Sequence, residues 1–491
     1  MGKLEELIIS LPDVTKLKDF NVYPDSINQF EDSWVFMLKE EAADYIVATG
    51  NAAKFFLGKD FHSNSVSYVV AELNHENAKT LRKLFPFTAP TAVLDSDRTF
   101  GVGDRLGIAC PGHIRVFKDY DARPIFAQQS IRELKLTNRT YANVLDAVTF
   151  SVFRDGYKLG FGADGDHLKT PEEIDYALDN GYTMITLDLS EHIRGGNGWE
   201  RIELPEELKN RYLNCGFTVE GEKIVYDVDE LKKCFHIYGE ALKFAVKIYF
   251  EYIFKSERKI NFEVSIDETS TPTTPAQHYF VANELNLAEV QLDTLAPRFC
   301  GEFQKGIDYI GDIEQFEKEL KTHAAIARHF GYRLSIHSGS DKFSIFELIG
   351  KYTEGKFHVK TAGTNWLEAM RVVALKDPLL YREIHAFALE KFDEAKRFYY
   401  VTTDLNRIPK LEEVKDSDLP LYFENNDARQ LIHITYGFIL NAKNEDDSFR
   451  FKDRLYAFWR KHEDTYSDMI NRHIGRHLKL LYAGKENLGG K

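Results

Sequence analysis

The sequence predicts an α/β protein whose centre is a closed (β/α)8 barrel of the TIM type, with an N-terminal α/β cap and a C-terminal helical extension. From about residue 120, short apolar segments that end in polar residues alternate with helical segments, which is typical of parallel βα units. Eight such strands can be identified, and eight is the number that closes this barrel. The chain has 491 residues, enough for one large barrel with additions.

The N-terminal cap is predicted over residues 1–115. Short helices alternate there with strand-like runs such as YIVATG (45–50) and SVSYVVAEL (65–73). No repeat or linker separates this part from the rest, so the order of the elements alone sets the boundary.

The barrel is predicted over residues 116–440. The predicted strands are RPIFAQQ (123–129), KLGFGAD (158–164), YTMITLD (182–188), KINFEVSID (259–267), AEVQLD (288–293), YRLSIH (332–337), KFHVKTA (356–362) and FYYVTTD (398–404). An insertion at about 190–258 separates the third strand from the fourth. Its last part (229–254) has the periodicity of a long amphipathic helix, which we expect to cover the barrel or its mouth.

The C-terminal extension is predicted to be helical over residues 441–491. His473 and His477 lie four residues apart on one helical face, a spacing that can bind a metal. No carboxylate of the HExxH kind lies between them, so a packed or solvated face is the favoured interpretation.

Composition and charge exclude several classes of protein. The net charge of −14 argues against a general nucleic-acid binder, which needs a clustered positive surface. The N-terminus does not resemble a secretion signal, and no window is apolar enough to span a membrane. The four cysteines form no CxxC pair. These features favour a cytoplasmic protein with buried free thiols.

Strand alternation predicts which side chains enter the barrel. In NFEVSIDE the apolar residues face outward, so Glu263, Ser265 and Asp267 face inward. The same parity turns inward Asp164 and Asp166, with His167 just beyond them, and also Ser335, His337, His358 and Lys360. Functional groups of such barrels gather at the C-terminal strand ends, so these groups are expected at one rim.

Carboxylates and imidazoles that converge from different strands are the ligands a divalent metal prefers. Asp166, His167, His337 and one of Asp267 or Glu268 supply this mixture. The alternative is that the acidic residues at the strand ends cap the following helices. Their coincidence at one rim favours the metal.

A substrate anion is expected beside the metal. Ser338 and Lys342 follow His337, and Arg298 follows the strand AEVQLD, so hydroxyls and cations collect at the same rim. Carboxylate and phosphate both suit such a site, and a solvated turn is the alternative. The run TFGVGDRLG lacks a full GxGxxG fingerprint and is a weak nucleotide signal.

Several blocks resemble conserved segments of the tagaturonate epimerase family. They are GDRLGIACPGHI (103–114), GADGDHLKT (162–170), DETSTPTTP (267–275), LSIHSGSDKF (334–343) and HVKTAGTNWLEA (358–369), which together span most of the chain. The resemblance implies a divalent-metal-dependent enzyme of hexuronate catabolism that interconverts D-tagaturonate and D-fructuronate. Some members act on the neutral ketohexoses tagatose and fructose, a 4-epimerisation.

The roles of individual residues rest on strand parity. We assign the metal to Asp166, His167 and His337, with Glu268 as a fourth ligand; its identity as Zn, Mn, Ni or Mg stays open. The acid/base candidates are Asp267 and Lys360, and Asp267 and Glu268 can exchange roles. The substrate anion is assigned to the remaining three, Arg298, Ser338 and Lys342.

The inverted carbon is one removed from the carbon alpha to the ketone, so its C–H is not acidified and simple enolisation cannot invert it. Reversible aldol cleavage is the favoured route, with a metal polarising the ketone. Transient oxidation by a nicotinamide is the second. The competing functions are a metal-dependent aldolase, a ketose isomerase, a noncatalytic sugar-binding barrel and a glycoside hydrolase.

Overall fold

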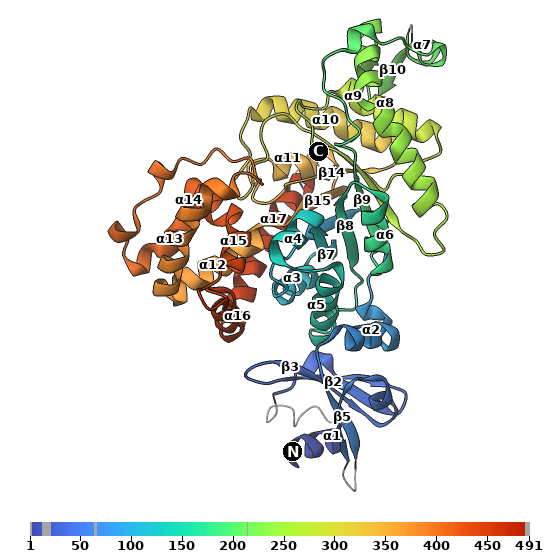
Figure 1. Cartoon of the computed structure of the whole chain (residues 1–491). Helices are drawn as coiled ribbons and strands as arrows, with labels where there is room; N and C mark the ends of the chain where they lie inside the picture. Colours follow the sequence, from blue (N-terminus) through green and yellow to red (C-terminus); the bar gives the residue numbers. More distant parts are fainter. Residues whose placement is uncertain (1, 12–20, 63–65, 214, 487–491) are drawn as a thin grey trace.

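The computed structural model describes residues 2–11, 21–62, 66–213 and 215–486. A closed barrel lies at the centre of the molecule, with the N-terminal sheet at one end and the C-terminal helices along one side (Figure 1). The predicted (β/α)8 class with a helical C-terminal region is confirmed.

The barrel is formed by eight parallel strands. In spatial order they are β12 (Asn261–Ile266), β13 (Thr294–Pro297), β14 (Arg333–Ile336), β15 (Phe357–Thr361), β6 (Arg98–Val102), β7 (Arg123–Ser130), β8 (Gly162–Leu168) and β9 (Met184–Asp188), which pairs with β12. The barrel closes where β15 pairs with β6. Since all strands are parallel, their C-terminal ends meet at one mouth.

Three predicted strands differ from the structure. FYYVTTD is not a strand: Tyr400 is 72% exposed, and the aromatic run lies in a loop beside the barrel mouth. The barrel strand that replaces it is β6, which lies in the range that the sequence assigned to the cap. AEVQLD precedes the actual strand β13, and β8 begins four residues later than KLGFGAD. Local β-propensity cannot identify the partner that pairs with a segment.

The N-terminal sheet is antiparallel, in the order β1 (Asn28–Phe30), β2 (Ser33–Lys39), β3 (Asp44–Thr49), β5 (Ser67–Glu72) and β4 (Gly58–His62). One face packs on α1 (Gly2–Ser10). The other packs on α2 (His75–Leu84) and on α5 (Tyr141–Arg154) of the barrel, where Phe150 and Phe153 join the sheet core. Two of these strands, β3 and β5, confirm the predicted strands at 45–50 and 65–73; residue 65 lies outside the described part.

Most of the barrel helices begin at side-chain caps that the sequence supplies. The capped helices are α4 (Ile131–Thr137), α5, α6 (Pro171–Asp179), α9 (Pro275–Leu287) and α10 (Ile313–Phe330), while α3 (Cys110–Asp119) and α11 (Phe346–Tyr352) begin without one. Thr170 caps α6, and Thr274 forms a capping box with Gln277 at the start of α9. The acidic residues at the ends of β8 and β12 are therefore not caps, and the capping alternative is wrong.

The insertion between β9 and β12 contains the predicted long helix. It comprises α7 (Glu206–Tyr212), the hairpin β10 (Gly216–Val219) with β11 (Glu222–Val225), and α8 (Val228–Ile248), which continues as one π-helical turn to Ile253. Helix α8 packs against α9 on the outside of the barrel. No residue of α8 lines the cavities at the mouth described below.

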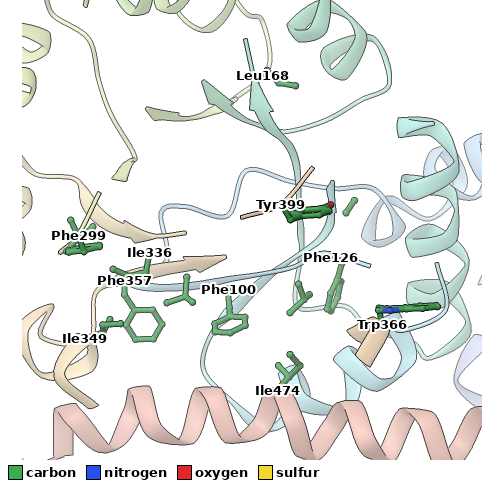
Figure 2. Packing of buried hydrophobic residues seen from close by; sticks show 14 of the residues in the cluster. Phe100, Phe126, Leu168, Phe299, Ile336, Ile349, Phe357, Trp366, Tyr399 and Ile474 are labelled. Atoms are coloured by element: carbon green, nitrogen blue, oxygen red, sulfur yellow. The ribbon is translucent and has the colours of Figure 1, made fainter. Parts of the chain in front are cut away.

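After β15 the chain forms α12 (Thr364–Lys376), α13 (Pro378–Ala395), α14 (Asn426–Ile434), α15 (Tyr436–Asn441), α16 (Lys452–Lys461) and α17 (Glu463–Glu486). Helix α17 packs against α11 and α3, which flank the closing pair of strands. Ile474 of α17 and Phe100 of β6 belong to the same core (Figure 2). The predicted C-terminal helical extension therefore packs on the outside of the barrel where its strands close. Residues 487–491 lie outside the described part.

Among the described residues, no helix combines the length and the apolar character that a membrane crossing requires.

Candidate active site

Two adjoining cavities open at the C-terminal ends of the strands. The outer one has a volume of about 440 Å³ and the inner one about 60 Å³. The residues that line both are Arg132, Asp267, Glu268, Lys305, His337 and Ser338. The predicted rim is therefore a real hollow at the barrel mouth, where enzymes of this fold hold their active sites.

His337 lies at the end of β14 and is tied to the barrel interior. Its Nε2 lies 2.7 Å from Oε1 of Glu263, and Thr294 donates to the other oxygen of that carboxylate at 2.6 Å. Burial raises the pKa of Glu263, but Lys360 and His337 outweigh burial and hold it well below the ordinary value. Because the ionised carboxylate only accepts, the neutral form of His337 that a metal would bind carries its hydrogen on Nε2 and presents a lone pair on Nδ1.

His167 reaches the same site through a break in strand alternation. The register of β8 shifts between Gly165 and Leu168, and His167 has a φ of 55°, in the left-handed region. As a result His167 and Asp166, although adjacent in sequence, interact, with Nδ1 2.7 Å from Oδ1. Asp166 fixes the hydrogen on Nδ1, so Nε2 of His167 is free to act as a ligand.

Asp267 lies between the two imidazoles. Its oxygens lie 3.3 Å from Nδ1 of His337 and 3.9 Å from Nε2 of His167. The ligand atoms of these three residues lie within 4.8 Å of one another, and Nδ1 of His337 is buried without a hydrogen-bond partner. Burial raises the pKa of Asp267, but both histidines outweigh it and hold the pKa well below its usual range. Three ligand atoms that converge with their outer partners in place fit a divalent metal.

Lys360 of β15 binds the carboxylates behind the histidines. Its Nζ lies 2.6 Å from Asp166, 2.7 Å from Asp164 and 3.2 Å from Glu263. Burial lowers the pKa of Lys360, but the three carboxylates outweigh burial and raise it well above the ordinary value. Burial also raises the pKa of Asp164 to about 6 despite Lys360. Lys360 is therefore a fixed charge and a poor base.

The remaining predicted residues divide into two groups. Glu268 lines both cavities, half-exposed and 3.8 Å from Lys169, and Ser338 accepts a hydrogen bond from Lys305 at 3.0 Å. Arg298 lines only the outer cavity. Lys342 lies elsewhere: it is fully buried, and its Nζ donates to the carbonyls of residues 304, 307 and 340. Its ammonium donors are all used, so the structure does not bring Lys342 to the rim.

Sequence reasoning passed over four residues of this site. Strand parity turned Glu263 and Asp164 inward, and alternation was therefore the available signal, but neither received a role. Arg132 and Lys305 lie in the segments that follow β7 and β13. Neither belongs to a motif, so only the tertiary structure identifies them.

His473 and His477 of α17 form a second cluster around Asp341, away from the mouth. Nε2 of His473 lies 2.8 Å from Oδ1 of Asp341, and Nε2 of His477 accepts the backbone N–H of Asp341 at 3.0 Å. Arg429 pairs with the other oxygen at 2.6 Å. These contacts anchor the loop after β14 to the C-terminal helices. The ligand atoms of His473, His477 and Asp341 also lie within 4.8 Å of one another, close enough to hold a metal ion, so the packed face stays a prediction.

Known proteins resemble the chain along almost its whole length. The family profile of UxaE, tagaturonate epimerase, matches residues 23–481. The tagaturonate/fructuronate epimerase of Thermotoga maritima is 43% identical over 479 residues, which are 94% of this chain and 97% of that protein.

Solved structures from Cohnella laeviribosi agree with the fold. The native crystal structure of its fructuronate-tagaturonate epimerase UxaE is 47% identical, with a TM-score of 0.91 over 97% of this chain and 99% of that one. A complex of the same enzyme with one glycerol is 48% identical, with a TM-score of 0.92 over 98% and 99%. The family that the sequence blocks resemble is thus confirmed: the chain belongs to the tagaturonate epimerases, a family of carbohydrate isomerases.

Proposed function

We propose that this protein interconverts D-tagaturonate and D-fructuronate with the help of a divalent metal held by His167, Asp267 and His337. The observation that carries the proposal is the convergence of their three ligand atoms within 4.8 Å at the barrel mouth. Family membership and the names of the relatives support the substrate pair. Strand parity left open which of Asp267 and Glu268 is the metal ligand and which is the acid/base group. We assign the ligand role to Asp267.

The residues around the candidate ligands fit a metal rather than a set of free catalytic histidines. Asp166 and Glu263 each hold the outer nitrogen of one imidazole. Such carboxylate partners orient a ligating histidine and strengthen its inner nitrogen as a donor. When bound, a divalent metal supplies a positive charge that stabilises the oxyanion of a ketone as it becomes an enolate.

The reaction that these residues favour is reversible aldol cleavage. A base removes the proton of the hydroxyl on the carbon to be inverted, the bond to the carbon alpha to the ketone breaks, and its electron pair enters the enediolate. The aldehyde turns and the bond forms again on its other face, so no oxidant is consumed. The inversion then needs neither an acidic C–H nor a nicotinamide.

Glu268 is the base that we assign. It lines both cavities and has no carboxylate or imidazole partner among the described residues, and its ion pair with Lys169 is long at 3.8 Å. Its proton can therefore be exchanged with solvent or substrate. Lys360 stays protonated; it neutralises Asp164 and Asp166 and so keeps the outer partner of His167 in place.

The test is epimerisation of both hexulosonates, followed by NMR, with metal-stripped protein and after addition of Mn²⁺, Zn²⁺, Ni²⁺ or Mg²⁺. Restored activity that Asp267→Asn and His337→Ala both abolish, while Glu445→Gln on the exposed surface retains it, supports the proposal. Full activity of the metal-stripped protein would show that the reaction needs no metal. Cleavage without epimerisation would make the protein an aldolase.

Isotope effects separate the two routes to inversion. Aldol cleavage predicts a ¹³C effect at the inverted carbon without a primary deuterium effect on its C–H bond. Transient oxidation predicts the primary deuterium effect, because that bond then breaks. A primary deuterium effect would overturn the aldol route and leave the metal site to be judged by the first test.

A further inference from the structure

Within the part of the chain that the structure describes, two cations that line both cavities of the candidate active site have no carboxylate partner, and a third, Arg298, lines only the outer cavity. Arg132 and Lys305 each line both the outer and the inner cavity. Among the described residues, no carboxylate oxygen lies within 4 Å of either side-chain cation. Unpaired cations in one cleft are notable in a chain of net charge −14, where anionic partners are abundant.

Arg132 is held in position without a carboxylate in direct contact. It lies in the first turn of α4, with its guanidinium carbon 4.9 Å from the centre of the Tyr399 ring. The neighbouring Glu133 is already engaged by the buried Arg105, whose Nε lies 2.9 Å from Oε1. Stacking on an aromatic face orients the planar guanidinium while its N–H donors stay available.

Lys305 lies on the loop after β13, and its Nζ donates to Oγ of Ser338 at 3.0 Å. Burial lowers its pKa, Arg132 and Arg105 lower it further, and Glu133 and Glu268 offset only part of this shift. The two cations of the cleft therefore repel each other. A bound anion would relieve this repulsion, and a carboxylate offers acceptors to both groups at once.

We propose that Arg132 and Lys305 bind the terminal carboxylate of the sugar acid and thereby select hexulosonates over neutral ketohexoses. This inference rests on the proposed function, because it assumes that the ketone end points toward His167, Asp267 and His337. Both cations and all three ligands line the inner cavity, so they surround one space. Arg298 lines only the outer cavity and is not part of the proposed pair.

The pair of Arg132 and Lys305, which we call the carboxylate clamp, also affects the proposed reaction. In aldol cleavage of a hexulosonate, the carboxylate remains on the aldehyde fragment and not on the enediolate. A cation pair that holds this carboxylate retains the fragment while its carbonyl turns. Loss of the clamp should therefore weaken substrate binding and also increase escape of the aldehyde.

The experiment uses the metal-loaded full chain and the variants Arg132→Met, Lys305→Met and Arg132→Lys. Arg472→Met and Lys410→Met serve as controls, since both side chains are exposed and lie outside the cavities. Steady-state epimerisation is measured for tagaturonate and, wherever turnover is detectable, for tagatose; released aldehyde is trapped and quantified. Thermal unfolding of every variant checks that the fold is retained.

We expect each methionine variant to raise KM for tagaturonate on the order of 10- to 100-fold, since a hydrogen bond to a charged group contributes about 1.5–3 kcal/mol. Arg132→Lys should raise KM by a smaller factor, because it keeps the positive charge but loses the forked pair of guanidinium donors. Aldehyde release should rise in the methionine variants. A KM within twofold of wild type in both methionine variants would overturn the clamp.

Failure of the clamp and failure of the proposed function give different results. If the wild type epimerises neither hexulosonate, the proposed function fails and calorimetric binding decides the clamp. Binding of tagaturonate that both methionine variants weaken at least tenfold, with tagatose binding less affected, supports the clamp. Equal weakening for the two sugars, or no weakening, overturns it.

Discussion

The imidazole rings of His167 and His337 lie 4.8 Å apart between their centroids, and each ring turns its outer nitrogen to a different buried carboxylate. The inner nitrogens face Asp267, which lies between the strands that carry the rings. Three strands that are distant in sequence, β8, β12 and β14, thus build one ligand set, and the outer carboxylates fix the tautomers of its two histidines.

Glu263→Gln is expected to lower the affinity for the divalent metal about 10- to 100-fold, because the outer partner of His337 loses its charge. The shape of the side chain is kept, so the cavity should not collapse. Metal titration by calorimetry measures the effect, with Glu445→Gln as the exposed control. Unchanged affinity would show that Glu263 does not support a ligand.

Lys360→Met is expected to lower the free energy of unfolding by about 3–5 kcal/mol, since it leaves buried carboxylates without their cation. Urea denaturation at pH 7.5 measures the loss. Lys356→Met, on the exposed start of the same strand segment, should cost less than about 1 kcal/mol. Equal stability of the two variants would contradict the role of Lys360 as a fixed charge.

Lys342→Met is expected to act on stability rather than on substrate binding. The substitution leaves three buried carbonyls without a donor, and an unsatisfied buried group costs about 1–3 kcal/mol. The midpoint temperature of thermal unfolding should be clearly lower for Lys342→Met than for the exposed control Lys410→Met. If KM rises while stability is unchanged, the sequence-based assignment of Lys342 to the substrate anion is restored.

His473→Gln is expected to remove part of the pH dependence of stability. Burial and the charge of Arg429 lower the pKa of His473. The carboxylates of Asp341 and Glu368 have the larger combined effect and raise this pKa above the ordinary value of 6.5. A histidine with a raised folded pKa stabilises the fold fully below pH 6.5, and this contribution is lost as the pH rises through the folded value.

Denaturation curves from pH 5.5 to pH 9 test this sign. The wild type should lose more stability than His473→Gln as the pH rises across this range. Parallel curves for the two proteins would mean that His473 does not carry the charge that pairs with Asp341.

The sequence by itself determined the barrel class and the inward groups at its mouth. Alternation along a strand is local, so Glu263, His337 and Lys360 follow from the pattern of their neighbours. The blocks that resemble tagaturonate epimerases indicated the family for the same reason, because they are continuous in the chain. Strand parity identified which residues face inward, but it did not show which of them contact one another.

Only the tertiary structure decided how that set is arranged. The register shift in β8 that turns the His167 ring toward the Asp166 carboxylate breaks the alternation on which parity depends. Arg132 and Lys305 line one cavity from segments that have no common motif. The closing strand β6 was misplaced because a strand is defined by its partner as much as by its own residues. Distances between segments far apart in sequence are fixed by packing of the whole core, and no local pattern contains them.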